Sequence, residues 1–233
     1  LNEPNGNAIQ SYLLGVWPPG KKDPQAAFRA IVNMVKAHAA AYRVIHTVQP
    51  QAQVGMAINY RSFFPGKPWF PPDRWIARLL SRNLNDTFPQ AAHTGVTRFL
   101  TFHQIIPEAE GTQDYIGLNY YVREYAVLNL LRYKDMFHRR YLRLDAQHSY
   151  TGYLANEPDG MLEGLKWCLQ FKKPIIITEN GVEDPDDRLR PRYLAEHLRQ
   201  VWRAVNFNWP VKGYFHWSLV DNFEWERGWT QRF

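Results

Sequence analysis

Two glutamates stand in settings that suit acid/base and nucleophilic chemistry. Glu179 closes the apolar run over residues 175–177 and is followed by an Asn-Gly pair, which places its carboxylate at the rim of a buried sheet. A charge buried there alone is costly, so it needs either a structural ion partner or a chemical purpose. Glu3 stands in an Asn-Glu-Pro tripeptide at residues 2–4, just ahead of a loop. Two carboxylates in different environments can divide the roles of general acid and nucleophile between them.

The Asn-Glu-Pro tripeptide is a weak signal by itself, because the chain contains it twice. The second copy covers residues 156–158 and follows no clear strand. It opens a predicted helix, where a glutamate in the first turn favours the helix dipole. We therefore interpret Glu157 as a helix-start residue and keep Glu3 as the candidate for chemistry.

A third cluster of functional residue types follows the last predicted strand. Residues 217–225 read Trp-Ser-Leu-Val-Asp-Asn-Phe-Glu-Trp. The rings of Trp217 and Trp225 can stack on the apolar face of a sugar, and Glu224 can accept hydrogen bonds from two adjacent hydroxyls. Core packing would explain the tryptophans equally well. The cluster therefore gains its meaning only together with the two glutamates.

Helical and strand patterns alternate along the chain, and they indicate how these residues are positioned. Apolar residues at helical spacing predict helices over residues 24–49, 74–83, 161–171 and 189–206. Short apolar runs predict buried strands over residues 53–59, 115–121, 174–179 and 211–217. This alternation implies right-handed βαβ units and a parallel sheet. Each strand ends in polar or aromatic residues and no glycine-rich phosphate loop is present, which favours the catalytic face of a barrel over a doubly wound sheet.

The net charge does not indicate a nucleic-acid partner. The 233 residues carry a formal net charge of +6, but Lys and Arg are spread along the chain. Their one concentration, residues 132–143, is interleaved with Tyr133, Phe137 and Tyr141. No RNA- or DNA-binding motif accompanies it, so we interpret it as a solvated loop or helix face and expect no nucleic-acid partner.

The cysteine content and the ends of the chain lead to three further expectations. Cys168 is the single cysteine, which predicts a buried, inert thiol in a reducing compartment and hence a cytoplasmic protein. No apolar run reaches the length of a bilayer span, so we expect no membrane contact. Leu1 does not look like a natural beginning, because no initiator Met precedes the tripeptide, and we expect an N-terminally incomplete chain.

Taken together, the motifs resemble glycoside hydrolase family 1, the β-glucosidase and β-galactosidase family, from end to end of the chain. The family's Asn-Glu-Pro, Asn-Tyr-Tyr, Thr-Glu-Asn-Gly and Trp-Ser-Leu-x-Asp-Asn-Phe-Glu-Trp motifs match residues 2–4, 119–121, 178–181 and 217–225. The resemblance implies an α/β fold, a (β/α)8 TIM barrel, of which this single domain, residues 1–233, covers about strands 5 to 8 plus the end of strand 4. The absent strands would supply a Gln, a His-Trp pair and an Arg to the sugar site.

Carried over residue by residue, the resemblance makes Glu3 the general acid/base and Glu179 the nucleophile of a retaining β-glucosidase-like hydrolase. In that mechanism the pKa of Glu3 is raised while Glu179 stays ionised, and no cofactor or metal takes part. The presence of both Glu3 and Glu224 points to unphosphorylated β-D-glycosides. The implied substrate-binding residues are Asn2, Asn119, Tyr121, Trp217, Glu224, Trp225 and Phe233.

Two features leave alternatives open. Many family members have a Trp after Gly near the aglycone site, where this sequence has Gly152 and Tyr153, so the aglycone preference is not predicted. The expected partner is a small β-glycoside or oligosaccharide. The alternative is a catalytically incomplete half-barrel that only folds, self-associates, binds sugar or is complemented by the missing half, because open edges of a parallel sheet favour association.

Overall fold

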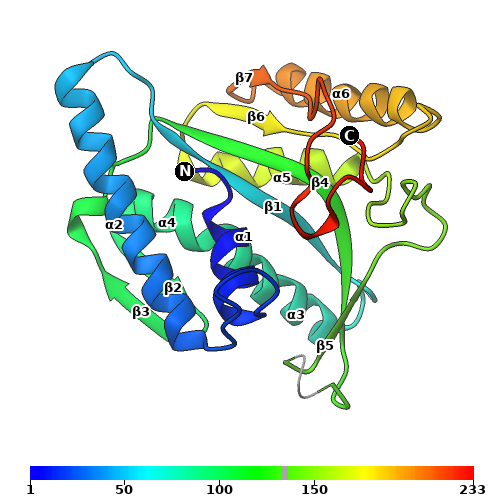
Figure 1. Cartoon of the computed structure of the whole chain (residues 1–233), viewed down its shortest axis with the longest axis horizontal. Helices are drawn as coiled ribbons and strands as arrows, with labels where there is room; N and C mark the ends of the chain where they lie inside the picture. The colour runs from blue at the N-terminus through cyan, green and yellow to red at the C-terminus, as the bar shows by residue number, and fades with distance from the viewer. Residues whose placement is uncertain (133–135) are drawn as a thin grey trace.

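The computed structural model describes residues 1–132 and 136–233, and its centre is a parallel sheet with helices packed on it (Figure 1). The parallel strands lie in the order β1-β4-β6-β7, which is also their order along the chain. Their bounds are Gly55–Pro65 (β1), Tyr115–Leu128 (β4), Ile175–Glu179 (β6) and Val211–Tyr214 (β7). All four predicted strands are confirmed, although β7 ends three residues earlier than expected.

Helices connect the parallel strands, as βαβ units require. The four long helices that the sequence predicts are confirmed as α2 (Pro24–Val48), α3 (Pro71–Ser81), α5 (Asp159–Cys168) and α6 (Arg190–Asn206). Shorter elements that the sequence analysis did not predict are α1 (Pro4–Ala8), α4 (Thr87–Thr94), and an antiparallel hairpin of β2 (Val96–Phe99) and β3 (Phe102–Ile105). Single turns of other helix types cover Ile9–Leu13, Arg82–Asp86, Pro107–Ala109, Leu169–Phe171 and Trp225–Arg227.

The bounds of α2 follow from its sequence. Asp23 caps the helix by accepting hydrogen bonds from the backbone N–H groups of Gln25 (2.8 Å) and Ala26 (3.1 Å), and Pro24 takes the first helical position, where it loses no hydrogen bond. The helix ends shortly before Pro50, which cannot continue it. One stripe of the helix is buried against the neighbouring elements: Phe28, Ile31, Val32, Val35 and Ala39.

Part of the basic segment over residues 132–143 is a strand, although the sequence predicted a solvated loop or helix face. Residues His138–Tyr141 form a short strand, β5, which pairs antiparallel with the far end of β4. This pairing extends β4 well beyond the predicted end at residue 121. The sequence did not show a strand pattern over residues 138–141, because β5 is short and exposes two arginines at the edge of the sheet. Edge strands commonly carry such charged side chains. Tyr133, which the sequence analysis included in this segment, lies outside the described residues.

The core lies on the helix side of the sheet. In β1 the side chains alternate, so Met56 and Ile58 are fully covered by helices while Ala57 and Asn59 remain half-buried on the opposite face. Cys168 lies in this core without exposure, as expected, and burial raises the pKa of its thiol. The face away from the helices is therefore the one that can present polar side chains. Within the part of the chain that the structure describes, no helix is long and apolar enough to cross a membrane.

Candidate active site

Glu3 is held beside the sheet by the first residues of the chain. Asn2 bridges in parallel to Ala57 of β1, and the backbone N–H of Glu3 donates to the Ala57 carbonyl at 2.8 Å. Residues 1–3 thus lie as one more short parallel segment beside β1, and Glu3 stands where that segment ends and α1 begins. Its backbone has φ 43° and ψ 45°. A residue other than glycine rarely adopts this left-handed conformation, and such strain is concentrated at functional sites.

The carboxylate of Glu3 accepts hydrogen bonds from the side-chain amides of two asparagines on neighbouring strands. Asn59 of β1 donates to Oε2 at 2.8 Å, and Asn119 of β4 donates to Oε1 at 3.0 Å. Asn119 also donates to Asn2 Oδ1 at 3.2 Å, while its own amide oxygen accepts from the Thr178 hydroxyl at 2.5 Å. Asn59 was visible in the sequence only as a polar strand end without a motif. Finding it requires the long-range register between β1 and residues 1–3.

Glu179 ends β6 next to this pair of strands. The Tyr121 hydroxyl donates to Glu179 Oε2 at 2.7 Å, and Tyr121 follows Asn119 by two residues on the same face of β4. Burial and then the negative charge of Glu3 raise the pKa of Glu179 to about 7, against hydrogen bonds from Tyr121, Asn119 and Asn2 that lower it. The expected mechanism keeps Glu179 ionised, whereas its burial favours the protonated form to higher pH than for an ordinary glutamate. Two neighbouring carboxylates disfavour double ionisation, so the charge of Glu3 adds to this effect on Glu179.

The raised pKa of Glu179 predicts that the folded chain loses stability as the pH rises. Below its ordinary value of 4.5 the carboxyl is protonated in both the folded and the unfolded chain. Between that value and about 7 only the unfolded chain ionises, so the free energy of unfolding falls by up to about 3 kcal/mol. Denaturant unfolding at about pH 4.5 and about pH 8 measures this fall. Glu179→Gln should reduce this fall in the free energy of unfolding, whereas the control variant Glu108→Gln, at an exposed position, should leave it unchanged. An equal fall in the two variants would contradict the raised pKa of Glu179.

The Asn-Gly pair after Glu179 fixes the backbone of the site. Asn180 is fully buried, and its amide donates to the Tyr120 carbonyl at 2.7 Å and to the Tyr193 hydroxyl at 3.0 Å. Its amide oxygen accepts from the Tyr214 hydroxyl at 2.9 Å. In the sequence this pair is part of the Thr-Glu-Asn-Gly motif, which indicates no partner for Asn180. The network instead ties the end of β6 to β4, β7 and α6.

Gly181 is required by a close approach of two backbones. A Cβ atom at this position would lie 1.7 Å from the carbonyl oxygen of Trp217, so Gly181→Ala must displace the chain on one side or the other. We expect this variant to lower the free energy of unfolding by about 2 kcal/mol or more. The control is Gly213→Ala, whose Cβ would meet Ile176 at an ordinary 3.6 Å. Equal denaturant midpoints for the two variants would contradict the steric account.

The predicted sugar-binding loop lies near the two glutamates. Glu224 is half-buried and accepts from the Asn222 amide at 2.8 Å. Burial raises the pKa of Glu224, and the charge of Glu3 adds to this effect, although the Asn222 hydrogen bond opposes it. Trp217 packs against the cluster that contains Phe233, and the Phe233 ring meets the Tyr121 ring edge-on, with centroids 5.8 Å apart. The red C-terminal segment in Figure 1 accordingly crosses over β4.

Trp225 reaches across to the loop that follows Glu3. Its ring stacks on Trp17, with centroids 5.0 Å apart and an interplanar angle of 20°. The Trp17 indole N–H also donates to Glu226 Oε2 at 2.5 Å. Trp17 had no motif to identify it in the sequence. Its two contacts join the loop after Glu3 to the loop that carries Glu224.

The second Asn-Glu-Pro copy stands directly before a helix, as predicted, but Glu157 lies ahead of the first turn. Glu157 precedes α5, which begins at Asp159, and its side chain is buried with 5% exposure. Its carboxylate lies 3.5 Å from Arg123 Nη1 and 3.4 Å from the Tyr125 hydroxyl. The interpretation as a first-turn residue is therefore wrong, because a buried ion partner on β4 determines its position.

The candidate residues thus gather across neighbouring parallel strands, with Glu179 at the end of β6 and Asn59 and Asn119 within β1 and β4. The structure brings Glu3 together with Asn2, Asn59 and Asn119, and joins Glu179 to Tyr121. The side chains available there are carboxylates, amides, a phenol and indoles, which suit proton transfer and nucleophilic attack. Across residues 1–132 and 136–233, no group of three or more His, Cys, Asp or Glu side chains is placed to hold a metal ion.

Comparisons with known proteins agree on one family. The family model of glycosyl hydrolase family 1 matches residues 1–233. A β-galactosidase of Pyrococcus woesei is 31% identical over 100% of this chain and 51% of its own length. The solved family 1 β-glucosidase of Thermotoga maritima is 30% identical with a TM-score of 0.91, covering 100% of this chain and 56% of that one. A structure of a Thermotoga maritima β-glucosidase in complex with castanospermine is 29% identical, with a TM-score of 0.88. The match covers 100% of this chain and 56% of that one.

Proposed function

Because the chain belongs to glycosyl hydrolase family 1, we propose that it carries the catalytic pair of a retaining β-glycosidase, with Glu3 as general acid/base and Glu179 as nucleophile. The observation that carries this proposal is the hydrogen-bonded convergence of Glu3, Asn119, Tyr121 and Glu179 on one face of the parallel sheet, where β6 ends beside β4. The chain spans about half the length of its relatives, 51% and 56% for the two proteins compared. The activity of the whole protein is therefore part of the proposal.

The sheet fits one part of a (β/α)8 barrel, which is the fold of the solved relatives. In our assignment β1, β4, β6 and β7 are barrel strands 5 to 8, and residues 1–3 are the end of strand 4. The support is the parallel order of these strands and the bridge from Asn2 to Ala57. Residues 1–233 then form a single partial catalytic domain. This places both glutamates on the catalytic face that such barrels use.

The proposed reaction is a double displacement. Glu179 attacks the anomeric carbon and the bond to the leaving oxygen breaks, while Glu3 gives that oxygen its proton; in retaining enzymes the two carboxyl groups stand about 5 to 5.5 Å apart. The covalent glycosyl-enzyme removes the charge of Glu179, so Glu3 then acts as base toward water. The attack requires Glu179 in its ionised form, which its raised pKa disfavours below about pH 7. The hydrogen bond from Tyr121 favours the ionised form of Glu179.

The remaining residues are proposed to bind the sugar. Trp217 stacks under the ring, while Glu224 and Trp225 bind the hydroxyls farthest from the scissile bond. Asn2 bonds to the 2-hydroxyl, and Phe233 borders the pocket beside Tyr121. The substrates are unphosphorylated β-D-glycosides. The complex of a solved relative with castanospermine, a sugar-like inhibitor, supports a small glycoside as ligand.

The stereochemistry of the first product tests this proposal. An aryl β-D-glucoside is incubated with the protein, and proton NMR follows the anomeric signals before mutarotation mixes them. A retaining mechanism releases β-glucose first, because two inversions restore the configuration. Release of α-glucose first would show an inverting enzyme and exclude Glu179 as a nucleophile.

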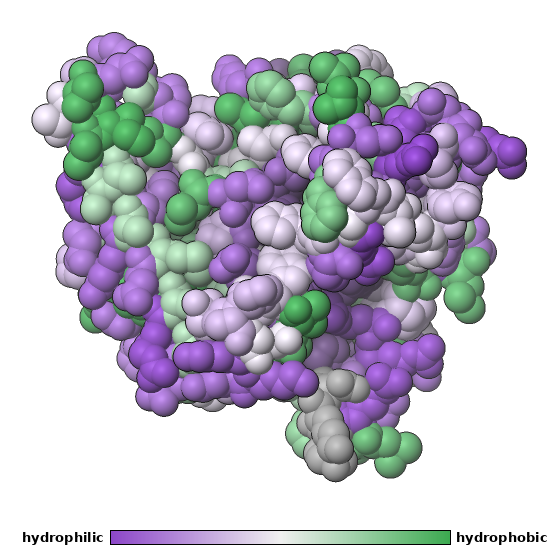
Figure 2. Space-filling model, in the orientation of Figure 1, coloured by the Kyte–Doolittle hydropathy of each residue, from purple (hydrophilic) through white to green (hydrophobic). Residues whose placement is uncertain are grey.

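A second candidate function is sugar binding and self-association without turnover. Two observations favour it. Within the described residues, the outer edge of β7 has no strand partner. An apolar patch also covers the end of α2 (Figure 2), where Val44, Ile45 and Val48 are 63%, 39% and 81% exposed. Sedimentation velocity together with the glucoside assay separates the two functions: a monomer with full turnover excludes this one, and an inactive oligomer that binds castanospermine supports it.

A further inference from the structure

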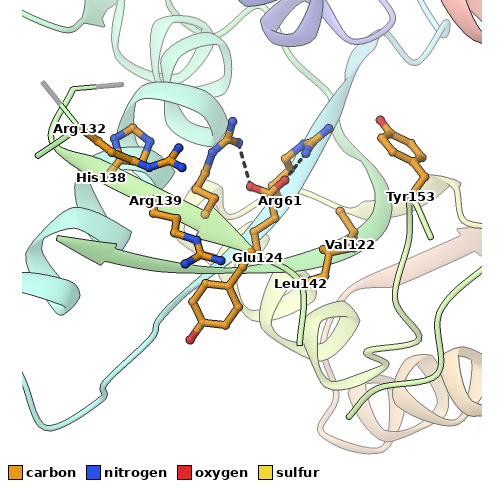
Figure 3. A pocket seen from close by; sticks show the side chains of 10 residues that line it. Arg61, Val122, Glu124, Arg132, His138, Arg139, Leu142 and Tyr153 are labelled. Atoms are coloured by element: carbon orange, nitrogen blue, oxygen red, sulfur yellow. Dashed lines mark hydrogen bonds and ion pairs between the residues drawn. The ribbon is translucent and has the colours of Figure 1, made fainter. Parts of the chain in front are cut away.

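A pocket of about 390 Å³ is lined by residues of β1, β4 and β5, on the same face of the sheet as the two glutamates (Figure 3). Arg61 lines it from β1. Arg61 follows Asn59 by two residues on the same half-buried face, so its Cα is about 7 Å farther along the strand. Asn59 is the residue that donates to Glu3. The pocket therefore begins next to the proposed proton donor to the leaving group.

A bulge in β4 turns a carboxylate toward this pocket. Tyr60 pairs with Tyr120, but Ser62 pairs with Arg123, so β4 holds one extra residue opposite Arg61. Such a bulge reverses which side chains face each side of a sheet. Arg123 consequently points to the helix side, where it pairs with Glu163 at 2.9 Å. Glu124 points into the pocket instead.

The pocket has more positive than negative charge. Glu124 forms ion pairs with two guanidinium groups, that of Arg61 (Figure 3) and that of Arg140, whose Nη1 lies 2.8 Å from Glu124 Oε2. Burial opposes ionisation of Glu124, but the two guanidinium charges outweigh it and lower the pKa. Its single charge is thus shared by two arginines. Arg139 also lines the pocket, is exposed, and forms no ion pair with any residue in the described ranges.

An aromatic side chain forms the other end of the pocket. Tyr153 lies opposite Arg139 in Figure 3. Arg227 stacks on the Tyr153 ring at 3.8 Å from its centroid, and Arg227 follows the sugar-binding loop directly. Tyr153 therefore links the pocket to the sugar site. The arrangement offers a flat wall at one end and guanidinium donors, which bind carboxylates with two parallel hydrogen bonds, at the other.

We propose that this pocket receives the leaving group of the substrate and selects an aromatic ring that carries a carboxylate. The inference rests on the proposed glycosidase function, because the leaving group departs on the side of Glu3. The ring lies along Tyr153, and its carboxylate binds Arg139 and Arg140. A volume of about 390 Å³ is sufficient for one aromatic ring with such a substituent. Glycosides of phenolic carboxylic acids are therefore the preferred substrate class.

Two glucosides that differ only in charge test this proposal. Para-carboxyphenyl and para-carbamoylphenyl β-D-glucoside are nearly identical in shape, so their kcat/KM ratio reports recognition of the charge. Arg139→Gln should lower this ratio about fivefold relative to the unmodified protein, because one screened charge contact is lost. Comparing ratios cancels the different leaving-group reactivity of the two phenols. The control is Arg199→Gln, which removes the same charge from the exposed face of α6 and should leave the ratio unchanged.

A binding measurement separates this inference from the proposed catalysis. NMR titration of the protein with para-hydroxybenzoate and para-hydroxybenzamide requires no turnover. Tighter binding of the benzoate that Arg139→Gln weakens and Arg199→Gln does not supports the pocket assignment, even where no hydrolysis is seen. Equal binding of the two compounds, or a preference that Arg139→Gln leaves intact, overturns it. Turnover of both glucosides with a ratio that Arg139→Gln does not change also overturns the pocket assignment, while the proposed glycosidase function stands.

Discussion

Replacing Glu179 by glycine is expected to lower hydrolysis of an aryl β-D-glucoside by about four orders of magnitude or more, because no other group can form the glycosyl-enzyme. Among the described residues, Glu179 is the carboxylate that ends β6 and receives the Tyr121 hydrogen bond. Steady-state kinetics with the unmodified chain as reference measures the loss. Unchanged activity in this variant would exclude Glu179 as nucleophile.

Added azide should restore turnover of the Glu179→Gly variant. The missing side chain leaves space on the face of the sugar from which Glu179 attacks, and a small anion can enter there. Only one displacement then occurs, so the product is the α-glycosyl azide, with inverted configuration. NMR identifies the product. Formation of the β-azide, or no rescue by azide in a variant that still folds, would contradict the assignment of the attacking face.

Replacing Glu3 by glutamine is expected to lower kcat/KM by about 10² to 10⁴ for glucosides whose leaving group needs a proton. Glutamine keeps the size of the side chain beside Asn59 and Asn119 but cannot transfer the proton. A dinitrophenyl glucoside needs no protonation, so its first displacement should be nearly unaffected. Burst kinetics with both substrates measures this difference.

The chain provides a matched control for the Glu3 variant. Glu157→Gln makes the same change in the second Asn-Glu-Pro tripeptide. Because Glu157 pairs with Arg123 on the helix side of the sheet, this variant should lose stability and keep its selectivity between leaving groups. If Glu157→Gln instead loses kcat/KM only for glucosides whose leaving group needs a proton, Glu3 is not the general acid.

Sequence patterns predicted the parallel sheet because its strands are buried. Runs such as residues 175–177 are apolar throughout, and a polar residue follows each run; Glu179 ends β6, whereas Asn119 lies within β4, which continues to Leu128. The same reasoning failed for β5. An edge strand of four residues with exposed arginines has the composition of a loop, and only its pairing with β4 defines it.

The parts of the candidate site that the sequence missed depend on contacts between distant segments. Asn59 is part of the site because residues 1–3 lie beside β1 and bring Glu3 within hydrogen-bond distance of it. Trp17 is part of the site because its ring stacks on Trp225 in the loop after β7. Neither residue belongs to a motif. The pKa of Glu179 could not be predicted from residue types either, because it depends on how deeply its carboxylate is buried and on the charge of Glu3 beside it.

Trapping of the glycosyl-enzyme tests the central claim most directly. A 2-deoxy-2-fluoro-β-glucoside with an activated leaving group slows the second displacement, so the covalent intermediate of a retaining enzyme accumulates. Proteolysis and mass spectrometry then locate the sugar. Our account predicts one fluoroglucosyl group on the peptide that contains Glu179, and its loss in Glu179→Gly. Stable labelling of Glu3 or Glu157, or turnover of the reagent with no covalent intermediate, would contradict it.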